Sequence, residues 1–134
     1  MEAGDTSLEK MNRAARREAV AIGAGRLLLG VSILAATRPA LKGLGFPDPS
    51  DATVALARLA GGRDVALGLH ALAVRNDRGR LREAVAIGAL VDAGDAVAFG
   101  LGLRGERETR RMAMRNAPAG AAAAIAGLRA LRRL

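Results

Sequence analysis

Near its middle, this 134-residue chain reads Ala60-Gly61-Gly62-Arg63-Asp64-Val65-Ala66-Leu67-Gly68-Leu69-His70. The stretch places an adjacent arginine and aspartate, and then the only histidine, inside an apolar run over residues 52–74. Charged groups in the middle of an apolar helix must be paired or hydrated, because an isolated buried charge is costly. We therefore expect these charges to determine how the helices of this protein pack together.

The next apolar run carries two further carboxylates, Asp92 and Asp95. At a spacing of three residues they lie on one face of a helix, and carboxylates that close disfavour joint ionisation unless a cation is near. Arg63 is the first candidate for that cation, and Arg26 is the second. His70 shares the helical face of Arg63, and we interpret it as an interior or interfacial histidine. The predicted polar network comprises Arg26, Arg63, Asp64, His70, Asp92 and Asp95.

Small residues supply much of the apolar content. Fifty-one per cent of the chain is apolar and 17 residues are Gly, but the only aromatic residues of the Phe, Trp and Tyr class are Phe46 and Phe99. Small residues allow helix backbones to approach closely, as in membrane bundles. The absence of Trp and Tyr counts against a membrane, because these residues mark its interfaces. The glycines predicted to mediate helix contacts are Gly61, Gly62, Gly68 and Gly88.

Periodicity and helix breakers predict a basic helix start at residues 1–18 and one four-helix domain at residues 19–134. The helices are predicted over residues 19–36, 52–74, 82–103 and 112–133. Arg38-Pro39 should end the first helix, because a residue before proline disfavours the helical conformation. Residues 37–51 are predicted to form a loop.

The remaining boundaries follow from caps and turns. Ser50 or Asp51 should cap the second helix, and a short polar turn over residues 75–80 should make the second and third helices antiparallel neighbours. Pro118 either kinks the last helix or divides it into two. Residues 17–24 recur identically as residues 82–89. Either duplication of a helical hairpin or chance repetition in Ala-rich helices would explain this.

The distribution of basic residues favours a membrane topology. The basic residues expected at one end of the helices are Lys10, Arg13, Arg16, Arg17, Arg75, Arg78, Arg80, Arg82, Arg129, Arg132 and Arg133. They outnumber those of the other connections, so the positive-inside rule places both termini in the cytoplasm. A charge at the centre of a membrane helix costs roughly 2.5–3.5 kcal/mol. The segment at residues 52–74 would therefore have to insert together with a neighbouring helix.

The residue inventory argues against several function classes. The absence of Cys excludes disulfides and thiolate chemistry, and a single His excludes a multi-histidine site within one chain. We identify no catalytic, cofactor-binding or metal-binding residue and predict no cofactor, which favours a non-enzymatic role. Arginines dispersed among helix ends, with no aromatic residues to stack on bases, argue against nucleic-acid binding. The expected partners are anionic lipid headgroups at the Arg-rich loops and a protein partner or a second copy of the chain.

The residues Gly61, Arg63, Asp64 and Gly68, followed by Asp92 and Asp95, carry a family resemblance over residues 19–103. The chain resembles uncharacterised small bacterial membrane proteins with four predicted helices, a Gly-x-Arg-acidic motif opening the second helix and an Asp-containing third helix. In general layout it is similar to DoxX-like membrane proteins. The resemblance implies a four-helix membrane protein with no assigned activity.

The first hypothesis is accordingly an all-α protein whose helices form an antiparallel up-down transmembrane four-helix bundle. The chain crosses the inner membrane several times and has a structural or partner-binding role. In it the polar network is a set of buried salt bridges that fixes helix register. The alternative is a soluble basic helical bundle acting through protein or nucleic-acid contacts. A weaker alternative is a membrane proton or ion relay, or a redox-associated protein, the latter by fold analogy alone.

Overall fold

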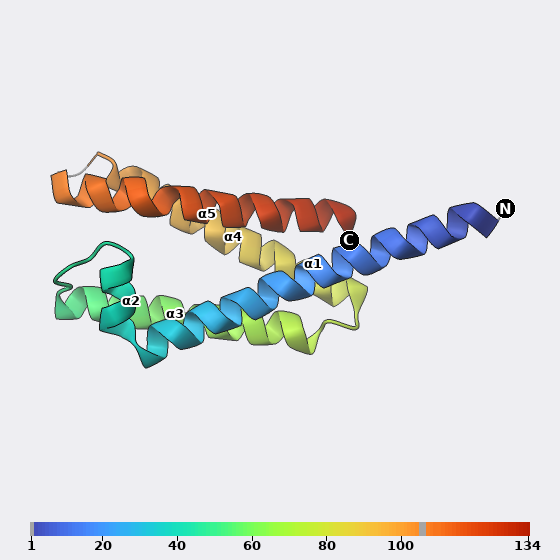
Figure 1. Ribbon diagram of the computed structural model, residues 1–134, viewed down its shortest axis with the longest axis horizontal. Helices are drawn as coiled ribbons and strands as arrows, with labels where there is room; N and C mark the ends of the chain where they lie inside the picture. The colour runs from blue at the N-terminus through green and yellow to red at the C-terminus, as the bar shows by residue number, and fades with distance from the viewer. Residues whose placement is uncertain (1, 105–106) are drawn as a thin grey trace.

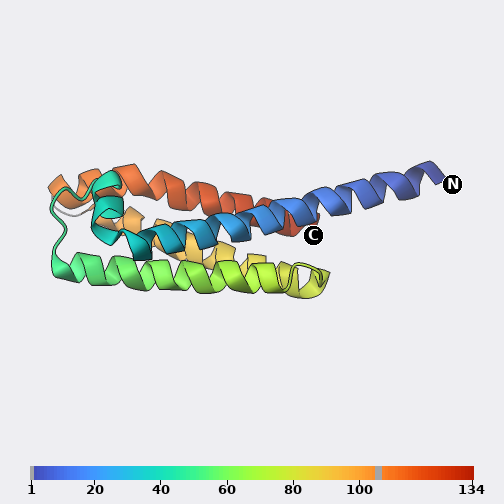
Figure 2. The same cartoon turned by 60° about the horizontal axis from the view of Figure 1, so that its bottom comes forward.

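The computed structural model describes residues 2–104 and 107–134. These residues form helices and no strands: α1 (Glu2–Ala35), α2 (Thr37–Gly43), α3 (Asp51–Ala73), α4 (Arg78–Gly102) and α5 (Arg107–Arg133). The predicted all-α class is confirmed. The four long helices share one long axis, and each runs back along the direction of the one before, while α2 lies at one end (Figures 1 and 2).

The first half of the chain differs from the predicted segments after residue 36. The basic start at residues 1–18 and the helix at 19–36 form one continuous helix, α1, which extends beyond the other helices at its N-terminal end (Figure 2). The predicted loop at 37–51 was wrong over its first half, because Thr37–Gly43 is helical. Pro39 lies in the first turn of α2, where its missing N–H would have no intrahelical partner.

Side-chain caps set the starts of the next two helices. Ser50 caps α3, its hydroxyl accepting a hydrogen bond from the Thr53 N–H at 3.2 Å. Asp77 caps α4 by accepting from the Arg80 N–H at 3.0 Å, so α4 begins earlier than the predicted residue 82. The last helix also begins earlier than residue 112, and α5 continues as one helix through Pro118.

The helices associate as two close pairs. α1 packs along α3 and α4 packs along α5, whereas α3 and α4, joined by the tight turn, contact each other much less. These two helices were predicted to be antiparallel neighbours; they do contact each other, but glycines make α1 and α3 the closer pair. A methyl group added to Gly30 would lie 2.6 Å from the Gly61 carbonyl oxygen, and one added to Gly68 would lie 2.7 Å from that of Gly23. The repeated octapeptide occupies the first long helix of each pair.

The two pairs meet in three successive regions along the long axis. Near the α3–α4 turn and the C-terminus, a small apolar core includes Ala19, Ala71, Leu81 and Ala130. Ionic side chains occupy the middle of the interface, and a cavity lies toward α2. Large apolar side chains face outward instead, among them Leu90, which is 74% exposed. The small core therefore leaves much of the apolar content of the helices on the surface.

Among the described residues, two helical segments are long and apolar enough to cross a membrane: Asn12–Ala35 in α1 and Arg78–Gly102 in α4. In each, only 22% of the most apolar 18-residue window is buried within the molecule. The charges of α3 and α5 leave these helices outside that group. These two helices belong to different pairs, and each is packed against a helix that does not meet the same criterion.

Candidate functional site

Arg26, in the C-terminal third of α1, contacts both α3 and α4. Its Nη1 donates to Oδ1 of Asp64 at 3.1 Å, and its Nη2 donates to the Asp92 carboxylate and, at 2.9 Å, to the Gly88 carbonyl oxygen. The side chains of Arg26, Asp64 and Asp92 are only 11%, 9% and 13% exposed. One guanidinium therefore links three helices at a largely buried site.

Arg63 makes the second connection between the helix pairs. Its Nη1 and Nη2 donate to Oδ1 and Oδ2 of Asp95 at 2.9 and 2.8 Å, a two-pronged pairing that fixes the relative orientation of both groups. Nη2 also lies 3.5 Å from Oδ1 of Asp64. Both members of the Arg63–Asp95 pair are 36% exposed, so water can reach this pair more easily than the contacts of Arg26.

Helical spacing explains which of these groups is buried. The buried face of α3 is formed by Val54, Gly61, Asp64, Gly68 and Ala71, at spacings of three, four and seven residues. Asp64 therefore belongs to the packed face, while Arg63, about 100° away around the helix, lies at its edge. On α4, the absence of a side chain at Gly88 leaves room for the Arg26 guanidinium, since an added methyl would lie 3.3 Å from Nε.

The structure brings five of the six predicted network residues together, and we refer to them as the Arg–Asp network: Arg26, Arg63, Asp64, Asp92 and Asp95. His70 is not among them. It lies on the same edge of α3 as Arg63, and its side chain is exposed. Seven residues separate the two positions, about 10 Å along the helix, and the short imidazole cannot span that distance. Each of the two candidate cations contacts one carboxylate of the pair, Arg26 contacting Asp92 and Arg63 contacting Asp95.

The four glycines predicted to mediate helix contacts differ in what surrounds them. Gly61 and Gly68 pack against α1, and Gly88 packs against Arg26. Gly62 makes no such contact, because an added methyl there would meet no atom within 4 Å. The sequence reasoning missed the partner glycines on α1, Gly23 and Gly30. Their seven-residue spacing, which matches that of Gly61 and Gly68, is the signal that could have identified them.

The Arg–Asp network contains one more carboxylate than it has guanidinium groups, so its formal charge is −1 when all five groups are ionised. Asp64 contacts both arginines through Oδ1. Within the described part of the chain, no hydrogen bond is made to its other oxygen, Oδ2. The same part of the chain contains no group of three or more His, Cys, Asp or Glu residues that could hold a metal ion.

A cavity of about 650 Å³ adjoins the network on the side of α2, and we refer to it as the α2-end cavity. Its polar wall is formed by Arg63, Asp64, Asp95 and Asn116, and its apolar wall includes Leu41, Phe46, Leu56 and Phe99. Asn116 of α5 also donates a hydrogen bond to the Leu44 carbonyl oxygen at 3.2 Å, which ties the C-terminal pair to the end of α2. The volume lies in the range of small-molecule sites, roughly 300–1,000 Å³.

Comparison with known proteins identifies one family, and the matched region contains both the network and the cavity. No match was found among the curated proteins or among the solved structures. The model of one protein family, described as a domain of unknown function (DUF4267), matches residues 23–132. This range includes every residue of the Arg–Asp network and of the cavity wall. The chain therefore belongs to the family of the domain of unknown function DUF4267.

Proposed function

We propose that this chain is a small integral membrane protein in which α1, α3, α4 and α5 form an antiparallel up-down transmembrane bundle. The observation that carries the proposal is the exposure of the most apolar helices. Only 22% of the apolar windows of α1 and α4 is buried, whereas a helix this apolar in a soluble protein is normally a buried core helix. Outward Leu, Ile and Val side chains would contact lipid in a bilayer.

The pairing of the helices supports the insertion of α3 and α5, which do not meet the spanning criterion by themselves. α3 contains Arg63 and Asp64, and charges at the centre of a membrane helix are costly in isolation. In the structure α3 packs along the apolar α1, and its charges are matched by those of α1 and α4. We infer that each pair inserts as a hairpin and that the Arg–Asp network then holds the two hairpins in register.

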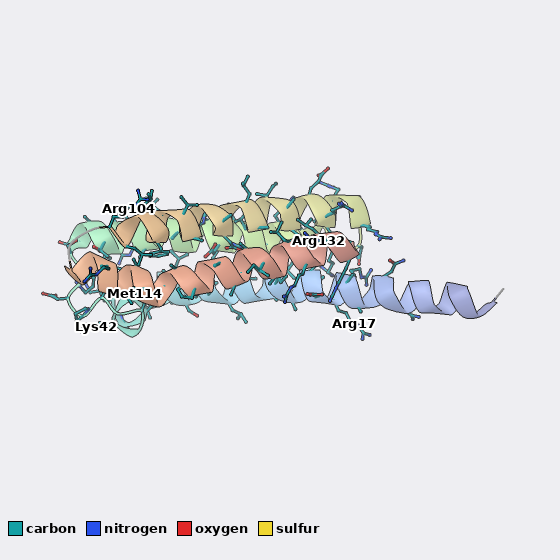
Figure 3. All side chains as sticks on the ribbon, turned by 90° about the horizontal axis from the view of Figure 1, so that it is seen from above. Arg17, Lys42, Arg104, Met114 and Arg132 are labelled. Carbon is teal, nitrogen blue, oxygen red and sulfur yellow. The ribbon has the colours of Figure 1, made fainter. Side chains whose placement is uncertain are left out.

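Basic residues support an orientation with both termini in the cytoplasm and several passes through the inner membrane. The C-terminus and the α3–α4 turn lie at one end of the molecule, beyond which the N-terminal part of α1 extends (Figures 1 and 2). Arg17 and Arg132 lie toward this end, whereas Lys42 and Arg104 lie toward the other (Figure 3). The Arg-rich end would contact anionic headgroups of the cytoplasmic leaflet. The role we propose is structural or partner-binding, with no reaction assigned.

Washing membranes with alkaline carbonate tests the central claim. We expect the full chain to stay in the membrane pellet, because its apolar helix faces are in contact with lipid rather than with water. A peripheral protein of the same membranes, bound by charge alone, is the control and should be released. Recovery of the chain in the supernatant without detergent would contradict the proposal and favour a soluble basic bundle.

The orientation can be tested with single cysteines, because the chain contains none. Asn76→Cys lies in the α3–α4 turn and Asp48→Cys lies in the connection before α3, and both positions are exposed. In intact cells opened only at the outer membrane, a membrane-impermeant maleimide should label Asp48→Cys. It should label Asn76→Cys only after the inner membrane is disrupted. The reverse pattern would invert the topology, and equal labelling of both would contradict a spanning bundle.

A further inference from the structure

We propose that the α2-end cavity binds a lipophilic organic cation, with Asp64 as its counter-ion. The cavity, of about 650 Å³, is bounded by one polar wall and a larger apolar wall. Ligand sites of this kind use the apolar surface for affinity and a few polar groups for specificity. Placement in a membrane does not by itself imply any ligand for this cavity.

The polar wall contains two carboxylates and one guanidinium, so its charge favours a cation over an anion. Among the three charged residues that line the cavity, the guanidinium of Arg63 already has both terminal nitrogens on Asp95. Its Nε has no hydrogen-bond partner among the described residues, but the two carboxylates of the same wall, Asp64 and Asp95, outnumber this one guanidinium and disfavour an anion. Asp64 has the opposite character, because its two arginine contacts use Oδ1 only and leave Oδ2 to accept a further positive group.

The formal charge of the whole network supports the same choice. Arg26 is shared between Asp64 and Asp92, so two guanidinium groups serve three carboxylates. A monovalent cation in the cavity would bring the total charge to zero. The Asp64 side chain is only 9% exposed, and neutralising a charge at a largely buried group is worth more than it would be in water.

The aromatic residues of the cavity point to the same ligand class. The chain has only two Phe and no Trp or Tyr, and both of these, Phe46 and Phe99, line the cavity. They come from different elements, the connection after α2 and the C-terminal part of α4. Aromatic faces attract cations, and the attraction is stronger where water is excluded. Aromatic walls and a carboxylate suit an organic cation with apolar substituents better than a small hydrated ion.

Tetraphenylphosphonium and tetraphenylborate, which have the same shape and opposite charges, test the proposal with the purified full chain in a non-ionic detergent. We expect calorimetry to show saturable binding of the phosphonium and none of the borate. Asp64→Asn keeps the shape of the side chain and leaves two arginines with two carboxylates. It should weaken phosphonium binding by roughly tenfold or more. Asp48→Asn removes the same charge at an exposed loop position and should bind as the unaltered chain does.

A second variant keeps the test decisive if Asp64→Asn fails to fold. Ala57→Phe adds volume in the apolar wall without changing any charge, and it should also abolish phosphonium binding. Equal binding of the two tetraphenyl ions, or phosphonium binding that survives both substitutions in folded protein, would overturn the proposal. Equal binding would indicate instead an apolar cavity that takes a lipid chain. Because the assay is done in detergent, its result is independent of the carbonate and labelling tests of membrane placement.

Discussion

Replacement of Arg26 by Met is expected to lower the free energy of unfolding by about 3–5 kcal/mol, the usual effect of removing one partner from a buried ion pair. The substitution leaves Asp92 without its charged partner and Asp64 with only the 3.5 Å contact to Arg63. It also removes the donor to the Gly88 carbonyl oxygen. Denaturant unfolding of the purified protein in detergent micelles, followed by circular dichroism, would measure the change.

Arg63→Met is the matched comparison, because it removes the same charge from the same network. Its pair with Asp95 is 36% exposed on both sides, so water can solvate the carboxylate that remains. We expect a smaller loss, about 1 kcal/mol, as for exposed ion pairs. Equal losses for the two arginines would show that the burial of Arg26 does not determine its contribution.

A double-mutant cycle separates pairing from general destabilisation. Combining Arg26→Met with Asp92→Asn should cost less than the sum of the single changes, by at least about 0.5 kcal/mol, because the stranded charge is removed as well. Combining Arg63→Met with Asp92→Asn should show a smaller coupling, since these two residues are linked only through Asp64 and Arg26. Additivity in the first combination would contradict direct pairing of Arg26 with Asp92.

Most members of the network could be predicted because the pattern that marks them, charged residues within an apolar helix, is local in the sequence. Asp92 and Asp95 are three residues apart in an apolar helix, and any such pair requires a cation. Which arginine meets which carboxylate depends on how the helices pack. The short turn between α3 and α4 favours Arg63 over Arg26, whereas each arginine contacts one carboxylate. The deciding contacts, between glycines of α1 and glycines of α3, are tertiary and leave only a weak spacing pattern in the sequence.

The α2-end cavity could not be predicted from the sequence for a related reason. Part of its wall comes from α2, for example Leu41, whereas the sequence predicts a loop over residues 37–51. Its two aromatic residues, Phe46 and Phe99, lie in elements far apart in the chain. The sequence around either phenylalanine does not indicate that the other lies near it in the fold. Each charged residue of the polar wall could be identified from the sequence. The apolar cavity that these residues line could not.

The glycines between α1 and α3 should be intolerant even of alanine. A Cβ at Gly30 would lie 2.6 Å from the Gly61 carbonyl oxygen and 2.7 Å from the Val65 nitrogen, and one at Gly68 would lie 2.7 Å from the Leu27 nitrogen. These are backbone atoms, so relief requires the two helices to move apart rather than a rotamer to change. We expect Gly30→Ala and Gly68→Ala each to destabilise the protein by about 1–3 kcal/mol, as overpacking does. Micelle unfolding by denaturant would measure this.

The same two helices supply controls that should change stability in the opposite direction. Methyl groups at Gly25 on α1 and Gly62 on α3 would meet no atom within 4 Å. Gly25→Ala and Gly62→Ala should therefore stabilise the protein, by up to about 1 kcal/mol, through the higher helix propensity of alanine. Because Arg26 is carried by α1 and Asp64 by α3, the clashing variants should also weaken binding of tetraphenylphosphonium, whereas the controls should not. If all four variants were stabilised alike, α1 and α3 would not be in backbone contact, and Arg26 would have to reach Asp64 by another arrangement.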